Sequence, residues 1–382
     1  MQCRYYIPTL NLIGRGCVQE IGHEARNLHG KRAFIVASTG AIGEGQADFV
    51  ASILEKEGLE CVRFCKAVPN PTVAVVDMGV AAYQRAQCDI IIAVGGGSAI
   101  DSAKAIGILV TNGGRIQDYD GVNRSQLAMP PLIAISTTAG TGSEITQFAV
   151  ISDEADHSKF TIIDWHMTPN VSVNDPEMML SMPPALTAAT GMDAMTHAIE
   201  AYVSKQATPV TDAKAWQGIA LAAKYLPTAV HDGQNMEARE NMCYASFLAG
   251  TAFNAAGLGL VHAMAHPLGG FYNLPHGVCN ALLLPHVALF NMDSSLEKFS
   301  SIAIALGVGQ SWRSPRDNAE LAIKALFAFQ KQLDLPVGLG ALGVKADDIP
   351  HLAGLALEEE IGKTNPRHYS KEQVEEIYRN AL

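Results

Sequence analysis

The architecture of this chain is best predicted from one segment, Cys88-Asp-Ile-Ile-Ile-Ala-Val-Gly-Gly-Gly-Ser-Ala-Ile-Asp-Ser-Ala-Lys104. An apolar, β-branched run gives way to three glycines and then to a helical pattern, which predicts a buried strand, a tight turn and a helix. We expect Ser98 to cap that helix. The free N–H groups of a helix start bind phosphate well, although a purely structural turn would have the same sequence. The segment matches neither the P-loop nor the Gly-x-Gly-x-x-Gly fingerprint.

A second glycine loop favours the nucleotide-binding interpretation. It has the sequence Ile133-Ala-Ile-Ser-Thr-Thr-Ala-Gly-Thr-Gly-Ser-Glu144, in which a predicted strand is followed by small and hydroxyl-bearing residues. Loops at the carboxyl ends of two strands form the crevice in which open α/β sheets bind nucleotides.

The residues around these loops alternate between apolar runs and helical patterns, as a parallel sheet requires. We predict strands at Arg32–Ala37, Cys61–Cys65, Asp89–Val94, Leu132–Ile135 and Val171–Val173, and helices near Ala47–Glu57, Ala74–Arg85 and Ile100–Leu109. This order predicts an α/β domain with a parallel, Rossmann-like sheet that helices cover on both faces.

After about Met182 only helical patterns follow one another. They cover Leu186–Val203, Thr211–Tyr225, Asn241–Phe253, Leu296–Leu306 and Ala319–Leu333. We therefore predict an α/β dinucleotide-binding domain at residues 1–182 and an all-helical domain at residues 183–382. A chain of 382 residues is long enough for two such domains.

Composition narrows the class of partner. The 27 Lys and Arg against 38 Asp and Glu give a net charge of −11, so nucleic acid and anionic membranes are poor partners. No signal segment is apparent, and the seven scattered cysteines, Cys3 included, favour reduced thiols and a cytoplasmic location. Residues 241–292 contain no Asp, Glu, Lys or Arg, but histidines and prolines interrupt the run repeatedly. We interpret it as buried core and expect no membrane span.

Histidines in this uncharged run form the second candidate site. His262 and His266 are four residues apart, and His276 follows at a Pro/Gly break. Asp193 and His197 have the same spacing, which on a helix places both side chains on one face. A single histidine is more often a hydrogen-bonded core residue than a ligand, but burying several unpaired imidazoles is costly. Neutral imidazole is the commonest metal ligand, so we expect a metal site.

Such a site suggests a reaction at an oxygen atom. One carboxylate and three imidazoles leave a divalent metal with a net charge of +1, which favours the negative charge of a deprotonated alcohol. His262 and His266 lack the Glu of a His-Glu-x-x-His metalloprotease. The ligand types permit iron, zinc, nickel or cobalt. Beside a nucleotide crevice, the site predicts hydride exchange between an alcohol and a nicotinamide.

The sequence resembles the iron-containing (group III) alcohol dehydrogenase family over essentially its whole length, with most similarity to short-chain alcohol dehydrogenases of the lactaldehyde reductase type. The matching motifs are Val68-Pro-Asn-Pro71, Gly95-Gly-Gly-Ser-Ala-Ile-Asp101, Thr137-Thr-Ala-Gly-Thr-Gly-Ser-Glu144, Gly191-Met-Asp-Ala-Met-Thr-His-Ala-Ile-Glu200, Gly259–Gly270 and Asn273-Leu-Pro-His-Gly277. The resemblance implies Fe2+ (or Zn2+ or another divalent metal), NAD or NADP, a small alcohol or aldehyde as substrate, and a homodimer or higher oligomer.

The resemblance also implies roles for individual residues. Asp193, His197, His262 and His276 would hold the metal, and His266 and Asp101 would be catalytic, although Asp101 is equally well explained as a first-turn carboxylate of its helix. Coenzyme contacts are implied at Asn70, Gly95, Gly96, Gly97, Ser98, Thr137, Thr138, Thr141 and Lys159.

One position departs from the family pattern. NAD-preferring relatives have an Asp at the end of the strand that Ser38 ends here. Without that carboxylate a 2′-phosphate is not repelled, so we predict use of both NAD and NADP. Two alternatives remain open, a reductase of a hydroxy or keto acid such as maleylacetate, and a nucleotide-binding metalloprotein without redox activity.

Overall fold

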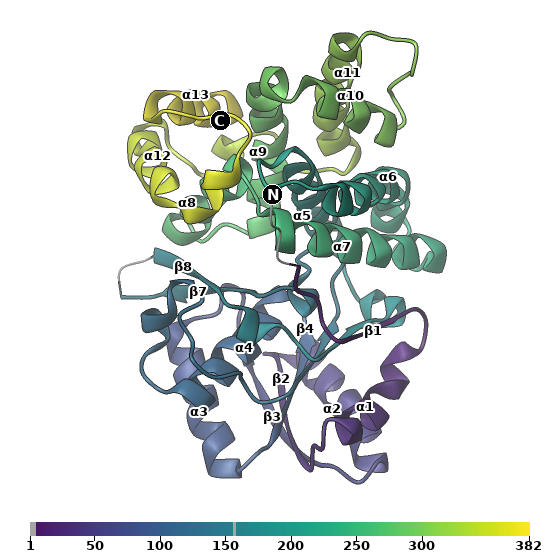
Figure 1. Ribbon diagram of the computed structural model, residues 1–382, viewed down its shortest axis with the longest axis vertical. Coiled ribbons are helices and arrows are strands. Elements are labelled where there is room, and N and C mark those ends of the chain that lie inside the picture. Colours follow the sequence, from purple (N-terminus) through teal and green to yellow (C-terminus); the bar gives the residue numbers. More distant parts are fainter. Residues whose placement is uncertain (1–4, 156–157) are drawn as a thin grey trace. The chain divides into compact units, whose positions relative to one another are not determined.

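A computed structural model of the protein describes residues 5–155 and 158–382 (Figure 1). Two compact units divide the chain. The first comprises Tyr6–Thr138 and Gly142–Leu180, and the second comprises Tyr5, Ala139–Thr141 and Ser181–Leu382. The division therefore falls at Ser181, and it assigns three residues of the second glycine loop to the later unit. Cys3 lies outside the described residues, and the other six cysteines form no disulfide.

The first unit is built on a six-stranded parallel sheet with the order β1-β9-β6-β4-β2-β3. All five predicted strands are confirmed, and β1 is the edge strand next to β9. The strands are β1 (Leu10–Ile13), β2 (Arg32–Ser38), β3 (Glu60–Ala67), β4 (Ile90–Gly95), β6 (Leu132–Ser136) and β9 (Val171–Asn174).

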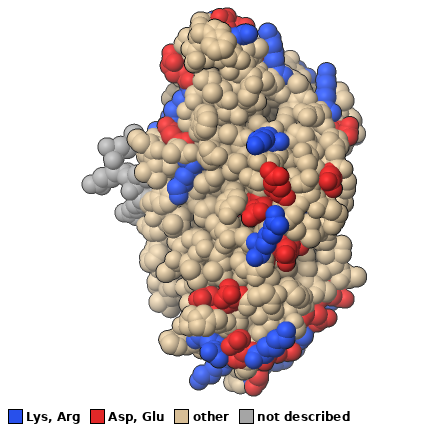
Figure 2. Space-filling view, turned by 90° about the vertical axis from the view of Figure 1, so that its right-hand side faces the viewer, with Lys and Arg blue, Asp and Glu red and all other residues tan. Residues whose placement is uncertain are grey.

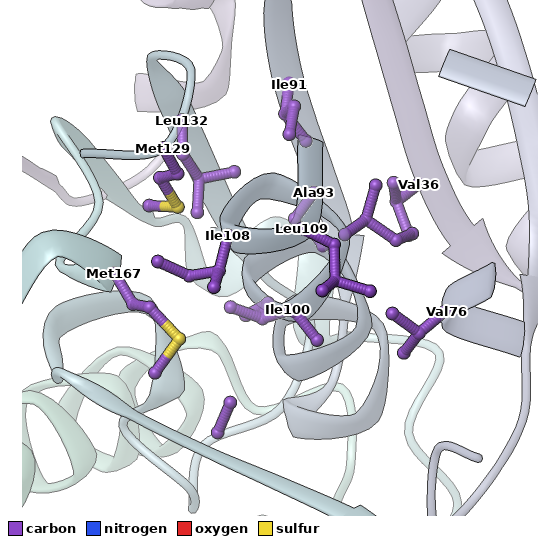
Figure 3. Close-up of a cluster of buried hydrophobic side chains, with 14 of the residues drawn as sticks. Val36, Val76, Ile91, Ala93, Ile100, Ile108, Leu109, Met129, Leu132 and Met167 are labelled. Carbon is purple, nitrogen blue, oxygen red and sulfur yellow. The ribbon is translucent and has the colours of Figure 1, made fainter. Parts of the chain in front are cut away.

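Helices cover both faces of this sheet, as the sequence predicts. Ile91 and Ala93 of β4 point into a core shared with α3 (Val73–Ala86) and α4 (Gly97–Asn112), part of which is drawn in Figure 3. Ile92 and its alternate neighbours point the other way, into a core shared with α1 (Ile21–Asn27) and α2 (Ala41–Lys56). A strand buried on both faces has a continuous apolar sequence, which explains why β4 was easily predicted.

A small second sheet was not predicted. Strands β7 (Phe148–Asp153) and β8 (Ser158–Ile163) form an antiparallel pair, and β5 (Gly121–Val122) adds to β8. Most residues of β7 and β8 are only half-buried, so these strands lack the apolar run that marks the main sheet.

The second unit is helical, and within the described residues it contains no strand, as predicted. All five predicted helices of this unit are confirmed, whereas α8, α9, α12 and α13 were not predicted. The helices are α5 (Pro184–Val203), α6 (Pro209–His231), α7 (Met236–Ala256), α8 (Leu260–Phe271), α9 (His276–Asn291), α10 (Leu296–Ala305), α11 (Pro315–Gln332), α12 (Ile349–Glu358) and α13 (Lys371–Ala381).

Among the described residues, no single helix has both the length and the apolar character that crossing a membrane requires. One bent pair, α7 with α8 at 102°, meets the length and composition test when taken together. On the face of the molecule in Figure 2, positive and negative side chains are interspersed and neither sign gathers into a large patch.

Candidate functional site

The predicted metal ligands come together within the helical unit. Asp193 and His197 lie one turn apart on α5, His262 lies on α8, and His276 is the first residue of α9. Asp193 Oδ1 lies 3.7 Å from the Nε2 atoms of all three histidines. The ligand atoms of Asp193, His262 and His276 all lie within 4.8 Å of one another, and the His197 ring stacks on that of His262 with centroids 4.7 Å apart.

This donor set fits a divalent metal. Bonds of about 2.0–2.2 Å in a tetrahedral site place ligand atoms about 3.4 Å apart, close to the separations observed. Asp193 and Glu200 are both buried, and among the described residues their ion-pair partners are all histidines. Two buried carboxylates without a Lys or Arg require positive charge from another source. The His276 side chain is 30% exposed, against 5% or less for the other three, so the cluster opens beside it.

Neighbouring groups fix the imidazole rings of the cluster. His262 Nδ1 lies 2.6 Å from Glu200 Oε2, and the other Glu200 oxygen accepts the Val261 N–H at 2.7 Å. His197 Nδ1 lies 3.2 Å from the carbonyl oxygen of Gly140. In the neutral rings these partners hold the proton on Nδ1 and turn the Nε2 lone pair toward Asp193, as metal ligands require. Burial opposes the charged form of His262, but Glu200 and Asp193 raise its pKa to about 9, so a metal that binds there displaces a proton. Sequence reasoning missed Glu200, although its spacing of seven from Asp193 places it on the same helix face.

The electrostatics favour an ionised Asp193. Burial opposes the charge, but His197, His276 and His262 hold the pKa of this carboxyl well below its usual range. Burial lowers the pKa of His197 to about 4, despite the opposing effect of Asp193. At neutral pH the pair therefore consists of a carboxylate and a neutral imidazole, the protonation states that bind metal.

His266 lies beside the ligand set. It is buried on α8, and its ring centroid is 5.5 Å from that of His276 and 6.3 Å from that of His262. Glu359 Oε2 lies 3.2 Å from His266 Nδ1. Phe253 of α7 stacks against His197 of the ligand set, with a centroid distance of 4.4 Å.

The two glycine loops meet at the carboxyl ends of β4 and β6. The Thr137 N–H donates to the Gly95 carbonyl at 3.0 Å, and a Cβ on Gly96 would lie 3.1 Å from Thr138 Cγ2. Gly95 has a φ of 153°, which favours glycine. The prediction that Ser98 caps α4 is wrong: Gly96 is the N-cap, without a side-chain bond, and Gly97 and Ser98 lie inside the first turn.

These loops fit a dinucleotide phosphate. A sixteen-residue helix without a side-chain cap offers N–H groups and positive potential at its start. The Thr138 Oγ1 atom is buried beside Gly96 and has no hydrogen-bond partner among the described residues. A bound ligand would provide that partner.

The other predicted coenzyme residues are placed as follows. Ser38 is the last residue of β2, and its hydroxyl lies beside Gly95. A Cβ added to Gly95 would lie 3.4 Å from Ser38 Oγ. Lys159 Nζ donates to Asn70 Oδ1 at 2.8 Å, and Asn70 has a left-handed backbone with φ 55°. Thr141 is one of the three residues of the second glycine loop, Ala139–Thr141, that belong to the helical unit.

Asp101 faces internal partners. Its carboxylate accepts the Ser143 hydroxyl at 2.5 Å and the Val150 N–H at 3.0 Å. Burial raises its pKa, while Lys104 acts in the opposite direction. Asp101 thereby ties α4 to the second glycine loop and to β7.

A buried lysine in the same region was missed by sequence reasoning. Lys104 Nζ donates to the carbonyl oxygens of Thr146 and Phe148, both at 2.8 Å, and to Ser143 Oγ at 3.2 Å. Burial lowers its pKa to about 8, although Asp101 and Glu144 act to raise it. Burial also raises the pKa of Glu144 to about 7. Lys104 therefore anchors the second loop through Ser143 and the Thr146 carbonyl.

Comparison with known proteins identifies similar chains. A family model described as iron-containing alcohol dehydrogenase matches residues 8–176, and one described as Fe-containing alcohol dehydrogenase family, C-terminal, matches residues 187–382. The chain is 46% identical over 378 residues to the NAD-dependent methanol dehydrogenase of Bacillus methanolicus, covering 99% of each chain. It is 40% identical over 370 residues to the lactaldehyde reductase of Escherichia coli K12, covering 96% of each. A crystal structure of 1,3-propanediol oxidoreductase superimposes with a TM-score of 0.98 at 44% identity, covering all of both chains.

Proposed function

Because this chain belongs to the iron-containing alcohol dehydrogenase family, we propose that it interconverts small primary alcohols and aldehydes with a nicotinamide coenzyme. The observation that carries the proposal is the convergence of three histidine Nε2 atoms on Asp193 Oδ1 at 3.7 Å. The names of the methanol, lactaldehyde and propanediol relatives all refer to short oxygenated substrates.

We assign Asp193, His197, His262 and His276 as the ligands of one Fe2+ per chain. When bound, a divalent metal supplies positive charge that stabilises the negative charge developing on the substrate oxygen. Glu200 and the Gly140 carbonyl orient two of the imidazoles for this task. The 30% exposure of His276 supports an approach of the substrate from that side.

His266 is assigned to handle the proton of the alcohol. Its buried ring lies next to the ligand set, and Glu359 Oε2 lies 3.2 Å from its Nδ1 atom, where a carboxylate can exchange a proton with the ring. Asp101 is assigned a positioning role, because both of its oxygens are engaged by the second loop and β7.

The coenzyme is assigned to the loops that follow β4 and β6. Its phosphates would accept N–H groups of Gly96, Gly97 and Ser98 at the start of α4. Contacts with Gly95, Asn70, Thr137, Thr138, Thr141 and Lys159 complete the proposed set. Ser38 offers a hydroxyl in place of a carboxylate, which supports use of both NAD and NADP.

A panel of alcohols and aldehydes, assayed with both coenzymes at about 340 nm, tests the proposal. We expect turnover of short primary alcohols, with kcat/KM for the two coenzymes within about a thousandfold of each other. Activity confined to keto acids would indicate a hydroxy-acid reductase instead. No absorbance change with any substrate would indicate a nucleotide-binding metalloprotein without redox activity.

We further propose a homodimer or higher oligomer in the cytoplasm. Within the described residues β1 pairs only with β9, so its other edge is available to a second copy of the chain. The six described cysteines form no disulfide with one another, which agrees with a reducing compartment. Light scattering coupled to gel filtration tests the oligomer, and a monomer mass would contradict it.

A further inference from the structure

Asn280 lies at the centre of the ligand cluster, although no pattern in the sequence points to it. It is fully buried on α9, one turn after His276. Its amide nitrogen Nδ2 lies 2.7 Å from Asp193 Oδ1, 3.0 Å from His262 Nε2 and 3.0 Å from His276 Nε2. One amide nitrogen thus contacts three of the four proposed ligand atoms, and its two hydrogens can be donated to two of them at a time.

These contacts compete directly with coordination. An imidazole nitrogen that carries no proton has a single lone pair, which either accepts a hydrogen bond or binds a cation. The Glu200 carboxylate faces Nδ1 of His262, so in the neutral ring the proton lies on Nδ1 and the lone pair on Nε2. A carboxylate oxygen has further lone pairs, so the bond from Asn280 to Asp193 is compatible with a bound metal, whereas the bonds to the imidazoles are not.

The orientation of the amide is fixed by the same neighbours. If the amide were rotated so that its oxygen pointed inward, that oxygen would lie about 2.7 Å from Asp193 Oδ1 in place of the nitrogen. Two acceptors would then face each other without a hydrogen between them. The nitrogen therefore points inward, which leaves Oδ1 buried without a hydrogen-bond partner among the described residues. An unsatisfied buried oxygen destabilises the fold, so the inward contacts must offset that loss.

We infer that Asn280 is a placeholder for the metal: its amide holds the ligand atoms together when no cation is bound and gives up its imidazole contacts when one binds. The inference rests on the proposed metal site, but it concerns the energy of the protein without metal. Asn280 therefore lowers the net affinity for metal while it stabilises the protein that has yet to receive it.

Cobalt binding to the full-length chain tests this role. Protein stripped with a chelator is titrated with Co2+ in a competing chelator, and the visible absorption bands report the ligand field. In Asn280→Ala, protein without metal loses more hydrogen bonds than protein with metal. We expect Co2+ to bind about threefold to tenfold more tightly, as the loss of about one net hydrogen bond implies. The melting temperature should fall more without metal than with it, and the absorption bands should stay in place.

A control on the same helix separates this effect from general damage. Asn291 is also buried, and it exchanges amide hydrogen bonds with Asn365 at 2.8 and 2.9 Å. Asn291→Ala should destabilise both forms equally and leave Co2+ affinity unchanged. If Asn280→Ala does not fold, Asn280→Ser keeps one donor and should show a smaller effect of the same sign.

The outcomes distinguish the two proposals. If the wild-type chain binds no Co2+, the metal site itself is wrong. If the wild type binds Co2+ but the Asn280 variants bind it equally well or more weakly, the placeholder role is wrong. Shifted absorption bands in Asn280→Ala would also overturn it, because they would make the amide a direct ligand.

Discussion

Replacing Glu200 with Gln changes one charge in the interior of the cluster at nearly constant volume. Glu200 accepts from His262 Nδ1 at 2.6 Å and from the Val261 N–H at 2.7 Å. The Gln side chain has one acceptor oxygen for these two donors, so its NH2 group must face one of them. If it faces His262, the ring must move its proton to Nε2 and cannot bind metal; if it faces Val261, a backbone donor loses its partner.

The expected loss of metal affinity follows from the hydrogen bond between Glu200 and His262 that the substitution removes. A hydrogen bond to a charged group contributes about 1.5–3 kcal/mol, which corresponds to about tenfold to a hundredfold in an equilibrium constant. Changes in groups that orient metal-binding histidines weaken metal binding by a similar factor. We therefore expect the metal dissociation constant of Glu200→Gln to rise by about tenfold to a hundredfold.

Competition with a chelator of known affinity measures this change. Glu144→Gln provides a matched control, because Glu144 is also buried but belongs to the other unit. It should leave the dissociation constant of the metal unchanged. Wild-type affinity in Glu200→Gln would refute the argument that Glu200 sets the protonation of His262.

Three further changes test other parts of the account. His197→Ala should remove metal and activity together, with a loss of more than about a hundredfold in kcat/KM, and full activity in metal-free protein would contradict this. Ser38→Asp should lower kcat/KM with NADP by about tenfold or more while sparing NAD, because the new carboxylate repels a 2′-phosphate; equal losses would refute it. The raised pKa of Glu144, about 7 against 4.5 in the unfolded chain, means that the folded state binds the extra proton between these values. Its contribution to stability is therefore lost as pH rises from about 4.5 to 7. Relative to Glu144→Gln, the wild type should lose up to about 3 kcal/mol of unfolding free energy over that range, and a constant difference would show that Glu144 is not buried as described.

The first unit was predictable because its core strands are buried on both faces. Continuous runs such as Ile90–Val94 identified the strands of the main sheet. The hairpin of β7 and β8 was missed because its half-buried residues have no such run. Ser98 was expected as the helix cap because hydroxyl side chains favour that position, but α4 starts two residues earlier, at the glycines.

In the helical unit, proline obscured two helices that form the site. Pro267 lies inside α8 and Pro285 inside α9, and proline ordinarily disfavours a helix interior. Without a helix at α9, the spacing of four between His276 and Asn280 carried no meaning, so Asn280 was missed. The sequence did bring Asp193 and His197 to one helix face, but only the folded chain shows which histidines from α8 and α9 meet them.

The central claim is that Asp193, His197, His262 and His276 hold the one metal ion on which activity depends. Titration of metal-stripped protein with Fe2+ under anaerobic conditions, followed by alcohol oxidation at each step, tests it most directly. We predict that activity rises in proportion to added metal and reaches its limit at one ion per chain, with no such rise in His197→Ala. Full activity in the stripped wild type before any metal is added would contradict the claim.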